Sequence, residues 1–147
     1  MNLAYLHVIM SHLPIIGIPV ALCFLIWGVY TGNRSLEKFS LLALFGLAVA
    51  VLPVFLTGEP AEDFLEKLPG ISGGLIEAHE DIGVFSLTMT LVAGGAAFAA
   101  FWFQHLESKR RLINIGVIVL AILSIMSLLY TAKLGGQIRH TEFQSLE

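Results

Sequence analysis

Four long apolar runs constrain the fold of this chain more than any other feature of its sequence. They cover residues 3–30, 36–56, 75–103 and 112–134. Each run reaches the length of about 20 residues that a helix needs to cross a hydrocarbon core about 30 Å thick. A helix also satisfies every backbone hydrogen bond within the spanning segment itself. The chain is 56% hydrophobic and 13% charged, whereas soluble chains are about 25% charged. The sequence therefore predicts an all-α integral membrane protein.

The connections between the runs predict how the helices are arranged. Residues 31–35 and 104–111 form short polar turns, so each joins two antiparallel neighbours. Between the second and third runs, Pro60 suits the first turn of a new helix. Residues 61–68 then show an amphipathic pattern that is typical of a helix in the membrane interface, although a solvated loop also fits. We find no internal repeat. Residues 1–147 are expected to form a single antiparallel four-helix bundle with a short interfacial helix between helices 2 and 3.

Small residues in the third run predict where that helix packs closely. Gly95 and Ala99 are four residues apart and therefore share one helix face. Small side chains allow two helix backbones to approach each other in a membrane. We expect a packing seam along this face.

The basic residues predict the orientation of the bundle. Five of the eight Lys and Arg residues lie in or beside the two short turns. They are Arg34, Lys38, Lys109, Arg110 and Arg111. Loops rich in lysine and arginine stay on the cytoplasmic side. Both termini and the loop between helices 2 and 3 are therefore expected outside.

Four of the five histidines are predicted at the outer end of the bundle. They are His7 and His12 in the first run, His79 in the third, and His140 after the fourth. With a rise of about 1.5 Å per residue, His7 and His79 lie almost level, and His12 lies about 7–9 Å deeper. His105 stands at the opposite end, where it fits a solvated turn residue.

Two prolines follow the first pair of histidines. On a straight helix, His7 and His12 point about 140° apart, which is too far for one metal ion. Pro14 and Pro19 each remove a backbone hydrogen bond from the helix. We expect kinks at these residues, which shape a cavity and are able to turn an imidazole inward.

Imidazole is a common ligand of haem iron and of several other metals. His7, His12, His79 and His140 are therefore candidate axial ligands, and Arg139 is a candidate partner for haem propionates. Aromatic side chains at the same end would wall a porphyrin: Tyr5, Phe55, Phe64 and Phe85. Acids beside His79 would orient its imidazole: Glu77, Glu80 and Asp81. Each of these residues also fits a purely structural or solvated position.

These residues resemble a known family. The resemblance rests on short motifs in chain order: His7-x4-His12-x-Pro14, Thr57-Gly58 closing helix 2, His79 opening helix 3, and Gly135-Gly136 with a histidine beyond. They look like the DUF2231 family of bacterial four-helix membrane proteins, which opens with His-Pro-x3-His-Phe-Pro. Val8 and Leu13 depart from that pattern, and His140 stands closer to the glycine pair than in the family. The family has no established activity, and its layout, similar to b-type cytochrome subunits, implies haem binding. The resemblance also implies that the membrane is a bacterial inner membrane.

Three functions fit these observations. The first is a b-type cytochrome-like protein with one or two haems b, which passes electrons between a quinol and an outer partner. The second is a non-haem His/Glu metal site in a transport protein, although transporters usually have more helices and internal repeats. The third is a membrane anchor subunit of a respiratory complex without its own cofactor. A homo-oligomer is compatible with each of them.

We expect an electron-transfer protein or subunit rather than a stand-alone enzyme. The sequence has no Cys-x-x-Cys-His motif, which excludes covalent c-type haem. It has no Gly-rich phosphate loop and no nucleophile elbow. Its only basic patch is the pair of turns that sets orientation, so nothing supports a nucleic-acid partner.

Overall fold

The computed structural model describes residues 3–65 and 72–139, and nearly all of them are helical. The elements in chain order are α1 (Leu3–Thr31), α2 (Arg34–Leu56), α3 (Gly58–Leu65), α4 (Gly73–Trp102), η1 (Phe103–His105) and α5 (Glu107–Arg139). In the described part of the chain, four helices are long and apolar enough to cross a membrane. The predicted all-α fold, with four long helices and a short one between helices 2 and 3, is confirmed.

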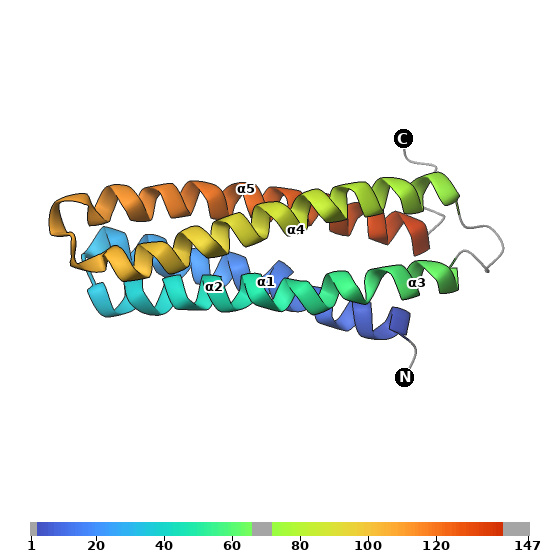
Figure 1. The fold of residues 1–147 in the computed structure, drawn as a ribbon, viewed down its shortest axis with the longest axis horizontal. Coiled ribbons are helices and arrows are strands. Elements are labelled where there is room, and N and C mark those ends of the chain that lie inside the picture. Colours follow the sequence, from blue (N-terminus) through green and yellow to red (C-terminus); the bar gives the residue numbers. More distant parts are fainter. Residues whose placement is uncertain (1–2, 66–71, 140–147) are drawn as a thin grey trace.

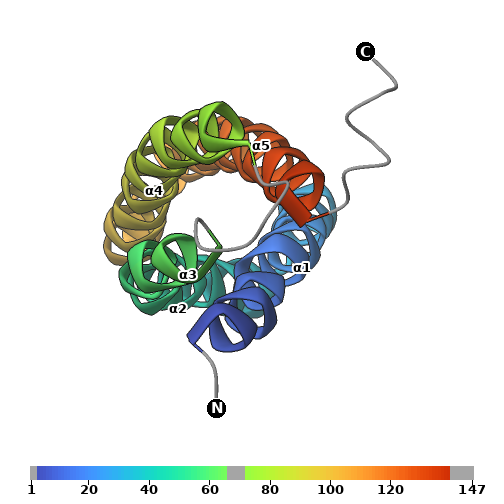
Figure 2. The same cartoon turned by 90° about the vertical axis from the view of Figure 1, so that its right-hand side faces the viewer.

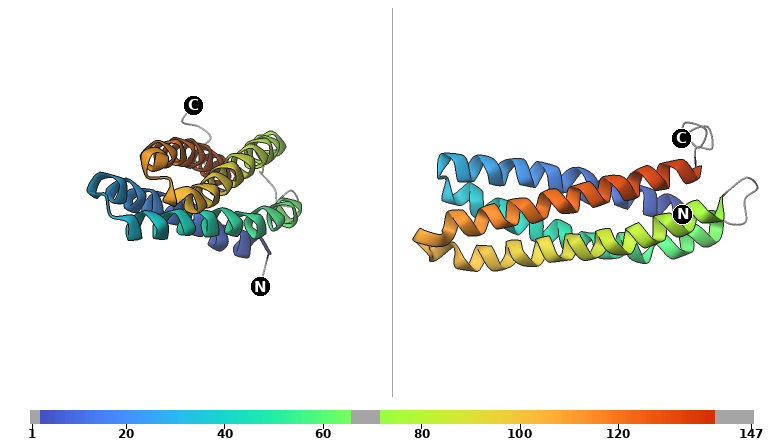
Figure 3. Two further views of the ribbon diagram at one scale, coloured as in Figure 1. Left: turned by 60° about the vertical axis from the view of Figure 1, so that its left-hand side comes forward. Right: turned by 90° about the horizontal axis from the view of Figure 1, so that it is seen from above.

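The four long helices run side by side as two antiparallel hairpins, α1–α2 and α4–α5 (Figure 1). α1 packs against α2 and α5, and α4 also packs against α2 and α5. α1 and α4 therefore lie diagonally opposite each other across the bundle axis (Figure 2). The tight turns that close both hairpins lie at one end of the bundle, which we call the turn end (Figure 3). The opposite end holds the start of α1, all of α3 and the start of α4, and we call it the histidine end.

Two helices, α3 and α5, differ most from their expected boundaries. α5 begins at Glu107 and continues to Arg139, five residues beyond the predicted range at each side. The chain does not turn at Gly135-Gly136, because Leu134 and Ile138 on either side remain buried in the bundle and keep the helix in place. α3 starts at Gly58 and follows α2 in nearly the same direction, interrupted only at Thr57 (Figure 1).

The helix faces toward lipid and toward the core are both apolar and differ in the size of their side chains. Large hydrophobic residues such as Ile16, Trp27 and Leu112 are more than half exposed. The core instead contains small or fully buried residues, including Ala97 and Ala121, neither of which is exposed. This arrangement is typical of membrane bundles, in which close packing rather than burial of apolar area joins the helices.

The packing seam between α2 and α4 lies one residue away from the predicted face. A Cβ atom added to Gly94 would lie 2.2 Å from Cβ of Ala48, so the two backbones approach each other there. Gly95 and Ala99 are exposed, and no described atom lies within 4 Å of a Cβ atom added to Gly95. The prediction of a small-residue seam in this helix was right in kind and wrong in the face that forms it.

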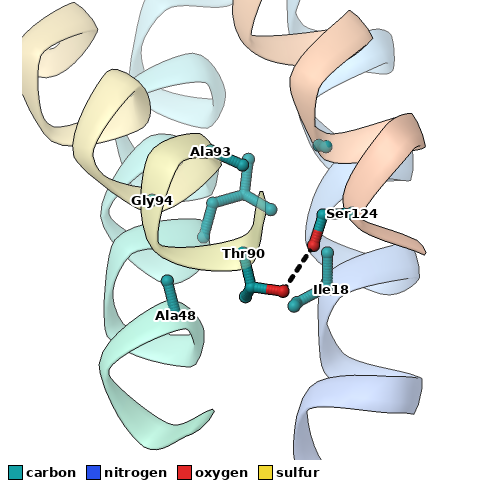
Figure 4. A pocket seen from close by; sticks show the side chains of 8 residues that line it. Ile18, Ala48, Thr90, Ala93, Gly94 and Ser124 are labelled. Carbon is teal, nitrogen blue, oxygen red and sulfur yellow. Dashed lines mark hydrogen bonds between the residues drawn. The ribbon is translucent and has the colours of Figure 1, made fainter. Parts of the chain in front are cut away.

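A small cavity lies beside this seam, in the middle of the bundle (Figure 4). Its volume is about 10 Å³, which is room for about one water molecule. The hydroxyls of Thr90 on α4 and Ser124 on α5 meet at its edge, 2.8 Å apart. Each hydroxyl satisfies the other in an apolar setting, so the pair stabilises the contact between α4 and α5.

A buried ionic cluster joins the two hairpins at the turn end. The Glu37 side chain on α2 is 1% exposed and accepts hydrogen bonds from Arg110 and Asn114 on α5. Gln104 in η1 donates to Asn114 at 2.9 Å. Gly28 on α1 leaves room for Glu37, because a Cβ atom there would lie 3.1 Å from its Cγ. Arg110, which we expected only to influence orientation, is therefore also the cation that allows an anion to be buried here.

Candidate functional site

Two of the predicted histidines face each other across the axis of the bundle at the histidine end. His7 comes from α1 and His79 from α4, the two helices that lie diagonally opposite. The centres of their rings are 6.5 Å apart, and the ring planes cross at 81°. Both side chains are half-buried. The predicted equal height of His7 and His79 agrees with this contact.

The imidazole of His7 is oriented by α2, its neighbour in the hairpin. Its Nδ1 lies 2.9 Å from the carbonyl oxygen of Val54 and 3.3 Å from Oγ1 of Thr57. The Thr57 hydroxyl itself donates to the Val54 carbonyl at 2.8 Å. A carbonyl oxygen only accepts hydrogen bonds, so Nδ1 of His7 must carry the proton. Nε2 therefore keeps its lone pair, which is the form of imidazole that binds a metal.

The imidazole of His79 is oriented in the same way by α5. Its Nδ1 lies 3.0 Å from the carbonyl oxygen of Thr131, so again Nδ1 donates and Nε2 keeps a free lone pair. The hydroxyl of Thr131 is held by Ser86 at 2.8 Å and by the carbonyl of Ser127 at 3.0 Å. These bonds fix the segment of α5 that positions His79.

The two hairpins thus build equivalent half-sites. In each, the first helix supplies a histidine, and the second supplies a carbonyl group with a glycine four residues later. The glycine that follows Val54 is Gly58, where an added Cβ would lie 3.7 Å from Cε1 of His7. The glycine that follows Thr131 is Gly135, where an added Cβ would lie 3.0 Å from Cε1 of His79. A side chain at Gly135 would crowd the His79 imidazole, whereas a methyl group at Gly58 would make only an ordinary contact with His7.

The structure does not bring His12 to this pair. His12 is exposed on the outer face of α1, and its Nδ1 lies 2.6 Å from the carbonyl oxygen of Val8 in the same helix. The prolines leave α1 helical throughout and do not turn His12 inward. His105 lies at the turn end, where Nδ1 donates to the Trp102 carbonyl at 2.9 Å, as expected for an exposed turn residue. His140 and the side chain of Arg139 lie outside the part that the structure describes.

The other residues proposed around the site also take different positions. Tyr5, Phe55 and Phe85 are 57%, 40% and 54% exposed, so they face outward rather than wall the histidine pair. The Phe64 side chain is not among those described. Three acids close to His79 are exposed: Glu77, Glu80 and Asp81. The backbone carbonyl of Thr131 orients His79 in the role that we had expected of these acids.

The distance between the two rings suits one metal centre held between them. With a metal–nitrogen bond of about 2.0 Å and about 1.1 Å from nitrogen to ring centre, two opposed imidazoles would place their centres about 6.2 Å apart. The observed distance is 6.5 Å. Among residues 3–65 and 72–139, no group of three or more His, Cys, Asp or Glu side chains is arranged to hold a metal ion. His7 and His79 are the two imidazoles that this end of the bundle offers to a metal centre among the described residues.

The chain was compared with protein families, curated proteins and solved structures. No protein family, no curated protein and no solved structure matches the chain.

Proposed function

We propose that this chain is a membrane electron-transfer protein that binds one haem b between His7 and His79. The observation that carries the proposal is the pair of imidazoles 6.5 Å apart on diagonally opposite helices. Each imidazole is tied through Nδ1 to a backbone carbonyl of a neighbouring helix. That bond fixes the ring and its tautomer, as outer-shell partners of metal-bound histidines do.

The donor set favours haem over a non-haem metal. Protein metal sites for zinc or iron usually take three or four protein ligands, whereas a low-spin haem takes two axial imidazoles on opposite faces of its ring. Two imidazoles from opposite helices meet the second requirement. The angle of 81° between the two ring planes is compatible with this proposal, because each imidazole would bind through a single nitrogen. The described residues thus favour one haem rather than two.

Occupation of both axial positions defines the kind of activity. When bound, a haem of this type supplies a one-electron redox centre with no open position for a substrate. The backbone carbonyls of Val54 and Thr131 would then hold the two ligands in place, which suits electron transfer. A quinol in the bilayer and a partner at the histidine end are the exchange partners that we propose.

The membrane setting completes the proposal. We place the protein in a bacterial inner membrane with the histidine end and both termini outside, because five of the eight basic residues lie at or beside the turns. Membership of the DUF2231 family belongs to the same proposal and rests on the motif residues alone.

Absorption spectra of the detergent-purified protein, oxidised and then reduced, test the function directly. We expect a low-spin b-type spectrum in the wild type. His7→Ala and His79→Ala should each remove the haem or convert it to a five-coordinate, high-spin form. His12→Ala and His105→Ala are matched controls, because both histidines are exposed and bond only a carbonyl of their own segment. A wild type without haem, or a normal spectrum in both His7→Ala and His79→Ala, would contradict the proposal.

A further inference from the structure

His12 presents an unused hydrogen-bond acceptor to the lipid. Its Nδ1 lies 2.6 Å from the Val8 carbonyl, so Nδ1 must donate and the neutral ring keeps a lone pair on Nε2. Within the described residues, Nε2 has no hydrogen-bond partner, and the side chain is exposed. Ionisable side chains in membrane helices are rare and usually face the bundle interior. One that faces the lipid is therefore a candidate functional site.

His12 lies at the depth of the acyl chains. Trp27 and Tyr30 are exposed aromatic residues at the turn end of α1, where they mark one boundary of the membrane. His12 is fifteen residues from Trp27, or about 22 Å along the helix. A hydrocarbon core about 30 Å thick then ends about 7 Å beyond His12, near the level of His7. Water does not reach such a position freely, so Nε2 needs a partner that dissolves in the bilayer.

The surroundings of His12 suit a small apolar molecule that carries a hydroxyl group. Val8, Ile9 and Ile16, on the turns before and after His12, are exposed and would contact a ring or an isoprenoid tail. Nε2 accepts a hydrogen bond and does not donate one while Nδ1 is engaged. A quinol hydroxyl donates, whereas the oxygens of the oxidised quinone only accept. The site should therefore distinguish the reduced form from the oxidised one.

We propose that His12 Nε2 binds the hydroxyl group of a membrane quinol and prefers it to the quinone. This proposal rests on the proposed function, in which a quinol is an electron donor. His7 is five residues away on another face of the same helix, so a quinol at His12 would lie about one helix diameter, or about 10 Å, from the histidine pair.

Binding of a short-chain benzoquinol and of the matching benzoquinone to protein in nanodiscs tests the proposal. The measurements are equilibrium dialysis under anaerobic conditions and ¹⁵N NMR of the histidine side chains. We expect the quinol to bind more tightly than the quinone and to shift the Nε2 resonance of His12. His12→Ala should weaken quinol binding by about 5–10-fold, the effect of one hydrogen bond, and leave quinone binding unchanged. His105→Ala, which removes an exposed histidine at the turn end, should change neither.

Three outcomes separate this inference from the proposed function. Equal quinol binding by His12→Ala and the wild type, with haem present in both, would overturn the role of His12 alone. A change from dimer to monomer in His12→Ala would also overturn it, because a second copy of the chain would then cover the imidazole. Quinol preference at His12 in a wild type that contains no haem would support the binding site and contradict the electron-transfer function.

Discussion

Replacement of Gly135 with alanine tests the candidate site at its most crowded point. The added Cβ would lie 3.0 Å from Cε1 of His79 and 3.4 Å from its Nδ1. Carbon atoms pack well at about 3.5–4.0 Å, so the imidazole must move by about 0.5 Å. The movement disturbs the 3.0 Å bond from Nδ1 to the Thr131 carbonyl. The orientation of the His79 ring relative to His7 would then change.

The expected effect follows from the role of that carbonyl. Loss of a partner that orients a metal-bound histidine lowers metal affinity by about 10–100-fold. The Thr131 carbonyl remains in place in Gly135→Ala, so we expect the lower limit, a loss of about tenfold, or about 1.4 kcal/mol. Alanine favours a helix by about 1 kcal/mol over glycine, which offsets part of the strain. Global stability should therefore change less than haem affinity does.

Titration of the haem-free protein with haem in detergent, followed by absorbance, measures this difference. Gly136→Ala is the matched control, because no described atom lies within 4 Å of its added Cβ. Gly58→Ala places its Cβ 3.7 Å from His7, an ordinary contact, and should bind haem nearly as the wild type does. Equal haem affinities of Gly135→Ala and Gly136→Ala would refute the role assigned to the glycine.

Three further predictions concern the frame of the bundle. Gly94→Ala would place a Cβ 2.2 Å from that of Ala48 and should destabilise the protein by about 1–3 kcal/mol in detergent unfolding, whereas Gly95→Ala should not. Glu37→Leu leaves Arg110 without its anion and should lower the free energy of unfolding by about 3 kcal/mol or more. Changing both Glu37 and Arg110 to leucine should recover most of that loss. If the effects of the two single changes simply add in the double variant, the pair is not coupled. A reporter fused after Glu147 should score outside, and a cytoplasmic signal would reverse the proposed orientation.

The number and order of the long helices were predictable, because each apolar run reaches the length that the bilayer requires. The equal height of His7 and His79 was predictable for the same reason, since a helix converts residue number into depth. The end of α5 was not predictable from Gly135-Gly136. In this helix the glycine makes space for His79 and does not end the segment.

The direction in which each side chain points could not be predicted from the sequence. A soluble helix shows its buried face by an apolar stripe, but these helices are apolar on every side because lipid and core are equally apolar. The inward direction of His7, the outward direction of His12 and the choice of Gly94 over Gly95 therefore left no signal in hydrophobicity. Only the size of the side chains carried some information.

The equivalence of the two half-sites was also hidden. Each histidine is held by a backbone carbonyl, and any residue type supplies one, so Val54 and Thr131 share no sequence signature. Besides the histidines, only the glycines four residues after these carbonyls, Gly58 and Gly135, are visible in the sequence as part of the shared pattern. The Glu37–Arg110 pair was missed because 73 residues separate its members.

The buried ionic cluster at the turn end has a consequence for how the protein is made. Membrane helices insert first and associate afterwards. Because Glu37 and Arg110 join the two hairpins without any cofactor, the turn end is able to assemble as soon as both hairpins are in the membrane. If the proposed haem binds, it would therefore enter a bundle that is already joined at the turn end, and its binding would be the last step of assembly.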